Sequence, residues 1–329
     1  MIAIFGAGAI GCWVGGKLAA GGAPITLIGR PRVLDELADG LRITEMQSDR
    51  ATRTTPCLAT TPAAAATAEL VLVTVKSAQT AEAGAALASV LPDHAIVVSL
   101  QNGVRNAEVL RAALPGRTVL AAMVPFNVVR REPGRYHRAT DGALRIDDDR
   151  AASPLLAACR AAALAIEPRR DMPAVQWAKL VMNLNNAINA LSGLPLVDEL
   201  AQRAFRICLA AAQREALELL AFGHQNVAKL TAIPPRWMPR LLEVPDRVFR
   251  LLARRVVAID PHARSSMWDD LEAGRPTEID YLQGEVVALA ARLGRGAPIN
   301  RALVGLVRRA EAGGRRDFGG EELRAMLAS

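Results

Sequence analysis

The chain begins with a strand, a glycine turn and a helix in immediate succession. The apolar run Ile2–Phe5 leads into Gly6, Gly8 and Gly11, a spacing that lets a backbone approach a pyrophosphate at a helix N-terminus. Residues 9–21 are small and apolar and end at a glycine pair, as expected of a helix packed on a sheet. A glycine turn without a ligand is the alternative. We predict a dinucleotide site whose candidate cofactor-binding residues are Gly6, Gly8, Ala9, Ile10 and Gly11.

The end of the next predicted strand, residues 25–29, bears on the choice of cofactor. An NAD site usually carries Asp or Glu at this point to bind the ribose 2′-hydroxyl. This chain has Arg30, followed by Pro31 and Arg32. A guanidinium suits a 2′-phosphate, so the sequence favours NADPH over NADH. A solvated arginine at a strand end is the alternative.

Two further apolar runs, residues 70–75 and 95–100, are typical of parallel strands buried on both faces. Each run is followed by a polar residue that could face a ligand, Lys76 in the first case and Asn102 in the second. Ligands of open α/β sheets bind at the carboxyl ends of the strands. Asn102 could therefore face a nicotinamide or a substrate, although Asn-Gly is also simply a common turn.

The rest of the chain separates into a strand-rich half and a helical half. Residues 41–60 predict a hairpin or an irregular insertion, and residues 119–129, 135–140 and 143–146 predict strands that complete the sheet in antiparallel fashion. No convincing strand follows about residue 168. A chain of 329 residues usually forms two domains, and we expect them at 1–170 and 171–329. In residues 41–60 and 225–260 the sequence indicates no functional role.

Composition narrows the function classes. The net charge of +7 comes from scattered arginines with few interleaved aromatics, so we expect no nucleic-acid partner. The sequence has no run of eighteen apolar residues and no signal-peptide pattern, and it predicts a cytoplasmic protein without membrane spans. Four separated cysteines without a CxxC pair predict free thiols and no metal site.

Lysine is rare in this chain, with only four residues against many arginines. A lysine is expected where a compact or titratable amine is needed. One of the four, Lys179, lies in a predicted helix from Asp171 to Ser192. At ~100° per residue, Asn183 and Asn186 project on the same side as Lys179. An amine flanked by amides can hold an oxygen-rich substrate, whereas a solvated polar face is the alternative.

A second cluster follows in the helical half. It comprises the Ser265-Ser266-Met267 segment and Thr277, which predicts the N-cap of a helix with Glu278 in its first turn. The helix dipole favours a carboxylate at that position. On spacing alone, such dipole compensation explains Glu278 as well as a functional role does.

Taken in order, these segments resemble the ketopantoate reductases (2-dehydropantoate 2-reductases), NADPH-dependent enzymes of pantothenate synthesis. The matching segments are Gly6-x-Gly8-x-x-Gly11, Arg30, Val73-Thr74-Val75-Lys76, Asn102-Gly103, Trp177-x-Lys179-Leu180-x-x-Asn183, Ser265-Ser266-Met267 and Thr277-Glu278-Ile279-Asp280-Tyr281. The resemblance covers nearly the whole chain. It implies an α/β fold in which an N-terminal Rossmann-type doubly wound sheet precedes an all-helical domain of the 6-phosphogluconate dehydrogenase C-terminal type.

The resemblance also implies residue roles. Lys179 would be the general acid that protonates the substrate carbonyl oxygen, and Glu278 would bond the substrate hydroxyl or orient the lysine. The implied cofactor contacts are Arg30 and Lys76, and the implied substrate contacts are Asn102, Asn183 and Ser266. Where the family has a second asparagine, eight residues after the lysine, this chain has Ala187, and Asn186 is the candidate to replace it.

The expected activity is the NADPH-dependent reduction of 2-dehydropantoate to pantoate. One alternative is reduction of a different 2-oxo acid by a member of the same family. An alternative of another class is a non-catalytic NADP-binding sensor, which would need the glycine turn but not Lys179 with Glu278. The expected partner is a small-molecule substrate, and a homodimer is left open.

Overall fold

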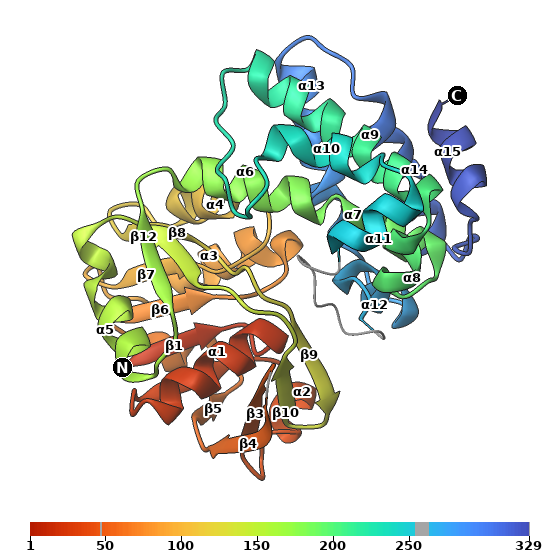
Figure 1. The fold of residues 1–329 in the computed structure, drawn as a ribbon. Helices are drawn as coiled ribbons and strands as arrows, with labels where there is room; N and C mark the ends of the chain where they lie inside the picture. The colour runs from red at the N-terminus through yellow and green to blue at the C-terminus, as the bar shows by residue number, and fades with distance from the viewer. Residues whose placement is uncertain (47, 254–262, 329) are drawn as a thin grey trace. The chain divides into compact units, whose positions relative to one another are not determined.

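A computed structural model of the chain describes residues 1–46, 48–253 and 263–328. The chain forms two compact units, Met1–Met172 and Pro173–Ser329, which are described separately below and are drawn in one ribbon view in Figure 1. Of the segment 225–260, residues 254–260 lie outside the described residues.

The first unit is built on an eight-stranded sheet with the order β12-β11-β8-β7-β6-β1-β2-β5. Its strands are β1 (Ile2–Phe5), β2 (Ile25–Ile28), β5 (Cys57–Ala59), β6 (Leu70–Val73), β7 (Ile96–Ser99), β8 (Thr118–Met123), β11 (Leu144–Asp147) and β12 (Ile166–Arg169). Six adjacent strands run parallel to one another, namely β8, β7, β6, β1, β2 and β5. Strand β11 runs antiparallel to β8. Because successive strands are added on opposite sides of β1, the sheet is doubly wound, as predicted, and changes direction between β1 and β6.

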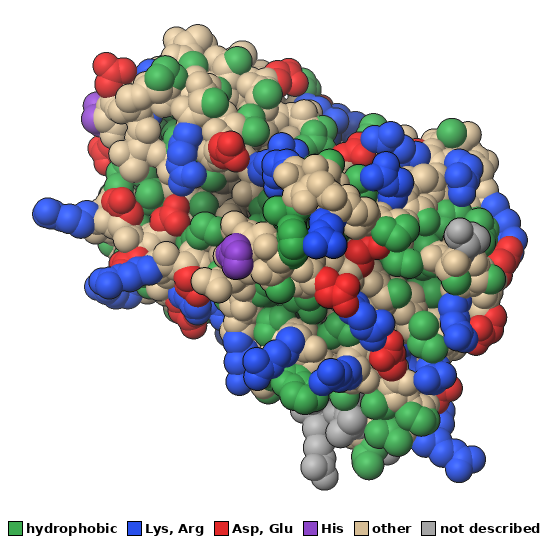
Figure 2. All heavy atoms as spheres, turned by 90° about the horizontal axis from the view of Figure 1, so that it is seen from above, with side chains coloured by type: hydrophobic (Ala, Val, Ile, Leu, Met, Phe, Trp, Pro, Cys, Tyr) green, Lys and Arg blue, Asp and Glu red, His purple; other side chains and the backbone are tan. Residues whose placement is uncertain are grey.

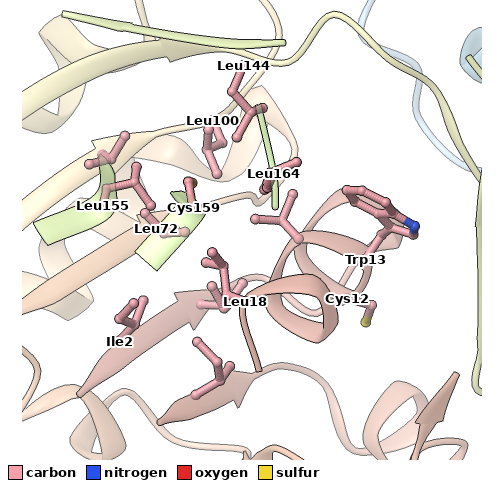
Figure 3. Close-up of a cluster of buried hydrophobic side chains, with 14 of the residues drawn as sticks. Ile2, Cys12, Trp13, Leu18, Leu72, Leu100, Leu144, Leu155, Cys159 and Leu164 are labelled. Carbon is pink, nitrogen blue, oxygen red and sulfur yellow. The ribbon is translucent and has the colours of Figure 1, made fainter. Parts of the chain in front are cut away.

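Helices cover both faces of this sheet. They are α1 (Ala9–Ala20), α2 (Pro31–Asp35), α3 (Thr80–Ala88), α4 (Asn106–Ala113) and α5 (Ser153–Ala161), with short 3-10 turns η1 (Pro62–Ala65), η2 (Ser77–Gln79) and η3 (Arg150–Ala152). On one face, Trp13 and Leu18 of α1 and Leu155 of α5 pack on the sheet (Figure 3). On the other face, Leu87 of α3 and Leu110 of α4 do the same. Burial on both faces explains the near-continuous apolar runs of the central strands.

A second sheet of four strands, with the order β4-β3-β10-β9, lies beside α1. Its strands are β3 (Leu41–Glu45), β4 (Ser48–Thr54), β9 (Val128–Glu132) and β10 (Arg135–Arg138). The Trp13 indole Nε1 donates to the Thr44 carbonyl oxygen at 3.1 Å, which joins α1 to this sheet. Strands β3 and β4 pair in antiparallel fashion, which confirms the hairpin expected within residues 41–60.

The expectation that the segments 119–129 and 135–140 complete the main sheet is wrong in part. Strand β8 joins that sheet in parallel, but β9 and β10 leave it and pair with β3. Most side chains of β9 are exposed and polar, so this strand does not suit a sheet covered on both faces. Only β11 supplies the antiparallel strand that was expected.

The described part of the second unit is helical throughout. Its elements are α6 (Met172–Asn183), α7 (Asn185–Ser192), α8 (Leu196–Ala201), α9 (Arg203–Phe222), η4 (Pro235–Trp237), α10 (Met238–Leu242), α11 (Asp246–Ala253), α12 (Ser266–Glu272), η5 (Ile279–Tyr281), α13 (Gln283–Arg292), α14 (Pro298–Glu311) and α15 (Gly320–Ala328). The long helix α9 packs against α10, α14 and α15. Its buried side chains, Phe205 and Leu209 among them, belong to the buried core of the unit. Within the described ranges, no helix has both the length and the apolar character needed to cross a membrane.

Charged side chains of both signs are interspersed on the one face of the molecule that Figure 2 shows, where Lys and Arg side chains lie among acidic and apolar ones. Many arginines contact carboxylates, as Arg130 does with Glu36 at 2.8 Å and Arg316 with Glu272 at 2.6 Å. Exposed pairs of this kind contribute at most about 1 kcal/mol each. All four cysteines are free thiols, as predicted.

Candidate active site

The glycine turn has a backbone that side chains would obstruct. Gly6 has a φ of +119°, and a Cβ built on it would lie 2.7 Å from the Val75 nitrogen. A Cβ on Gly11 would lie 2.1 Å from the Gly6 carbonyl oxygen. A Cβ on Gly8, by contrast, would meet no heavy atom of the described residues within 4 Å. The turn is therefore packed tightly on the sheet side and left open at Gly8.

The turn leads directly into α1. Gly8 is the N-cap residue, and no side chain caps the helix there. The first turn of the helix, Ala9 to Gly11, consequently presents backbone N–H groups that have no partner within the helix. The hydroxyl of Thr74, at the end of β6, donates to the Gly6 carbonyl oxygen at 2.6 Å. This open, anchored helix start fits the pyrophosphate of a dinucleotide.

Arg30 follows β2 at the same edge of the sheet. It is exposed and occupies the N-cap position of α2. A Cβ built on the preceding Gly29 would lie 2.5 Å from the Ala7 Cβ, so the end of β2 is in contact with the glycine turn. A cationic side chain thus begins next to the turn that fits a pyrophosphate.

Lys76 and Asn102 lie on adjacent loops. Lys76 is exposed and follows β6, while Asn102 is partly buried and follows β7. The Ser77 hydroxyl donates to the Asn102 carbonyl oxygen at 3.1 Å, which joins the two loops. Since β2, β1, β6 and β7 are neighbours in the sheet, the predicted cofactor residues of the first unit lie along one continuous edge.

Lys179 lies on α6 in the second unit and is partly buried. Burial lowers the pKa of its ammonium group to about 8, because a low-dielectric surrounding disfavours the charged form. Asn183 lies one turn further along the same helix, so its Cβ is on the same side as that of Lys179.

The predicted continuous helix from Asp171 to Ser192 is wrong, because a turn at Leu184 separates α6 from α7. The Gln213 side chain donates to the Val181 carbonyl oxygen at 3.2 Å, and the Gln283 side chain donates to that of Leu184 at 2.8 Å. Side-chain donors of this kind interrupt a helical hydrogen-bond ladder. Leu184 itself keeps a helical backbone, with φ −59° and ψ −18°, so the placement of Asn186 on the same side as Lys179 stays a prediction.

Ser266 is the first residue of α12 and is exposed. Its predecessor Ser265 accepts from the Trp268 nitrogen at 3.2 Å and so caps the helix. The Ser265 hydroxyl also donates to the Asn186 carbonyl oxygen at 3.1 Å, and its nitrogen donates to Asn189 Oδ1 at 2.8 Å. The structure therefore brings the start of α12 to α7, and with it Ser266 to the segment of Asn186.

Glu278 is buried and precedes the 3-10 turn η5. The Thr277 hydroxyl accepts from the Ile279 nitrogen at 3.2 Å, but the residue at the N-cap position of η5 is Glu278, so the prediction that Thr277 is a helix N-cap is wrong. The prediction that Glu278 lies in the first turn of a long helix is wrong, since α13 begins only at Gln283. Because the Gln283 side chain binds Leu184, this segment is nonetheless tied to the end of α6.

Sequence reasoning missed a buried carboxyl group beneath α7. Glu199 is fully buried, and burial raises the pKa of its carboxyl group to about 8. It accepts from Asn189 Nδ2 at 2.8 Å and from Asn185 Nδ2 at 3.3 Å. Through Asn189, this group helps to hold Ser265. The available signal was the pair Asn185 and Asn189, which are one helical turn apart on α7.

Comparison with known proteins matches both halves of the chain to one family. Residues 2–150 match the family model described as ketopantoate reductase PanE/ApbA, and residues 171–311 match the model of its C-terminal part. A Halobacterium salinarum protein named 2-dehydropantoate 2-reductase is 34% identical over 325 residues, covering 95% of this chain and 99% of that protein. An Archaeoglobus fulgidus protein of the same name is 29% identical and covers 95% and 98%, respectively.

Solved structures show the same fold. The crystal structure of a PanE/ApbA family ketopantoate reductase from Ralstonia eutropha JMP134 is similar at a TM-score of 0.81, with 30% identity and coverage of 95% of this chain and 98% of that one. A D-mandelate dehydrogenase, solved with NADH and anilino(oxo)acetate, also has a TM-score of 0.81 over 95% and 98%, at 17% identity. At that identity, the second similarity shows the fold alone.

Proposed function

The chain belongs to the ketopantoate reductase family of oxidoreductases, and we propose that it reduces 2-dehydropantoate to pantoate with NADPH, for pantothenate and coenzyme A synthesis. The name of the 34% identical relative supports this substrate. The observation that carries the proposal is Lys179. It is a partly buried lysine whose pKa is lowered to about 8, in a chain that uses arginine almost everywhere else.

In this proposal residues 1–170 hold the cofactor. The open helix start at Gly8 and the adjacent cationic Arg30 fit the pyrophosphate and the 2′-phosphate of NADPH, respectively. The cofactor, when bound, supplies the hydride for the 2-oxo carbon. Proposed contacts are Gly6, Gly8, Ala9, Ile10, Gly11, Arg30, Lys76 and Asn102.

Residues 171–329 hold the substrate and the acid. Lys179 Nζ gives a proton to the oxygen of the 2-oxo group as that oxygen gains charge. With a pKa of about 8, the lysine is still mostly protonated at pH 7, yet it releases its proton more readily than an ordinary lysine. An arginine holds its proton too tightly for this role.

The remaining polar residues orient the substrate. Asn102, Asn183, Asn186 and Ser266 are proposed to bind its carboxylate and hydroxyl groups. Glu278 is proposed to accept from the substrate hydroxyl or to orient Lys179. Ala187 stands where the family pattern has an asparagine, so the amide contacts of this chain differ from that pattern. A homodimer is the proposed assembly, which light scattering of the purified protein tests.

Oxidation of NADPH, followed at 340 nm with 2-dehydropantoate and with a panel of other 2-oxo acids, tests the activity. We expect the highest kcat/KM with 2-dehydropantoate. Turnover of another acid with none of 2-dehydropantoate would favour the alternative of a family member with a different substrate. NADPH binding without turnover of any acid would favour a non-catalytic sensor.

A further inference from the structure

Three polar side chains lie buried beneath the loops that carry Lys76 and Asn102. They are Thr80, Gln101 and Asn106, which are 1%, 7% and 5% exposed, respectively. They come from the start of α3, the loop after β7 and the start of α4, respectively. Polar groups are rare in such positions unless they form hydrogen bonds, and these three form a connected set.

Asn106 joins the two loops through one amide group. Its Nδ2 donates to the Asn102 carbonyl oxygen at 2.5 Å and to the Ser77 hydroxyl at 3.1 Å. The Ser77 hydroxyl in turn donates to the same Asn102 carbonyl oxygen. Three bonds thus connect the residue after Lys76 with the backbone of Asn102.

Gln101 makes a second connection between the same loops. Its Nε2 donates to the Val75 carbonyl oxygen at 3.1 Å, immediately before Lys76. The same Nε2 donates to the Thr80 hydroxyl at 2.7 Å, and the Gln101 Oε1 accepts from the Ser99 hydroxyl at 3.1 Å.

Thr80 links these two connections. Its hydroxyl accepts from Gln101 and lies 2.7 Å from Asn106 Oδ1 and 2.9 Å from the Ser77 carbonyl oxygen, either of which can accept its single proton. With that proton on the shorter contact, to Asn106, donors and acceptors alternate from Gln101 through Thr80 to Asn106. Because a buried set with all its bonds made is rigid, a shift of one loop would have to move the other.

We propose that Asn106 is a positioning residue, whose side chain sets the location of Asn102 relative to Lys76 with Thr80 and Gln101 in support. This inference rests on the proposed function, in which Lys76 and Asn102 contact the cofactor. A misplacement of about 1 Å at a reacting site can lower the rate by roughly a hundredfold. The network is the part of the fold that prevents such a displacement here.

Asn106→Asp is the sharpest test, since it conserves shape but removes both donors and places an acceptor beside the Asn102 carbonyl oxygen. We expect kcat/KM to fall by roughly ten- to a hundredfold. Asn300→Asp is the matched control. Asn300 is fully buried and its Nδ2 donates to the Ala212 carbonyl oxygen at 3.1 Å and to Glu215 at 2.8 Å, but it lies on α14. An equal loss in both variants would overturn the proposal.

A second pair keeps the proposal testable if Asn106→Asp does not fold. Thr80→Val removes the hydroxyl at nearly constant volume, whereas Thr80→Ser retains it. We expect Thr80→Val to lower kcat/KM, and we expect Thr80→Ser to retain most of the wild-type kcat/KM. Equal activity in the two variants would contradict the network.

Hydrogen–deuterium exchange separates this proposal from the proposed function. In Asn106→Asp, and in Thr80→Val, peptides covering 74–80 and 100–106 should both exchange faster, while peptides covering β1 and β2 should not. If the wild type turns over no 2-oxo acid, the proposed function fails, and exchange together with NADPH affinity still decides whether the two loops are coupled. Unchanged exchange in both peptides would refute the coupling itself.

Discussion

Replacing Lys179 by methionine should make the protein more stable at neutral pH. The pKa of its ammonium group falls from an ordinary 10.5 to about 8 because the group is buried. At 1.36 kcal/mol per pKa unit, this difference corresponds to a cost of about 3 kcal/mol for keeping the folded chain charged. Methionine has a similar length and no charge. Removing this cost should give a net gain of about 1–3 kcal/mol at pH 7.

The pH dependence of this gain is what identifies its cause. Below pH 8 the lysine is charged in both the folded and the unfolded chain, so the full cost is present. Between pH 8 and 10.5 only the unfolded chain binds the proton, so the stability of the wild type rises with pH relative to the variant. Above 10.5 both states are neutral and the difference should disappear.

Urea denaturation of wild type and Lys179→Met at pH 7 and at pH 10.5, followed by circular dichroism, measures this difference. Lys229→Met is the control, since Lys229 is an exposed lysine of the same unit. The gain should be present at pH 7, nearly absent at pH 10.5 and absent in the control. A variant that is less stable than wild type at pH 7, or a difference independent of pH, would refute the argument that burial holds this pKa down.

Three further predictions concern the proposed reaction. Lys179→Ala should abolish turnover while NADPH still binds, as fluorescence titration would show, and near-normal activity would remove this residue from the mechanism. In the wild type, kcat/KM for reduction should fall tenfold per pH unit above about pH 8 as Lys179 loses its proton, and a profile flat to pH 10 would contradict its role as the acid. Arg30→Asp should raise the KM for NADPH much more than that for NADH, so equal losses would exclude a 2′-phosphate contact.

The first unit could be predicted where its information is local. The strand β1, the glycine turn and α1 are contiguous, and the strands β6 and β7 are apolar on both faces. Strand β5 was missed because it has only three residues, Cys57–Ala59, two of them exposed. Strands β9 and β10 belong to the four-stranded sheet because β10 pairs with β3, which is far away in sequence. No local sequence pattern predicts this pairing.

The second unit was less predictable for a related reason. Lys179 and Asn183 were found because they are one helical turn apart. The interruption at Leu184 is associated with the amide of Gln283 from a distant segment, and Ser265 is held by Asn189 across a similar separation. Such hydrogen bonds form only after the helices pack, so the spacing of apolar residues along the sequence does not predict them.

The small sheet beside α1 implies an order of events during synthesis. Residues of β3 pair with those of β10, such as Ile43 with Tyr136, so β3 leaves the ribosome well before its partner exists. Domains tend to fold as they emerge, and here the indole of Trp13 can be joined to Thr44 of a finished small sheet only once β10 has been translated. In a nascent chain arrested before residue 138, α1 would therefore lack the completed four-stranded sheet against which it packs. We expect proteases to cleave along α1 more readily in that chain than in a chain arrested after residue 170.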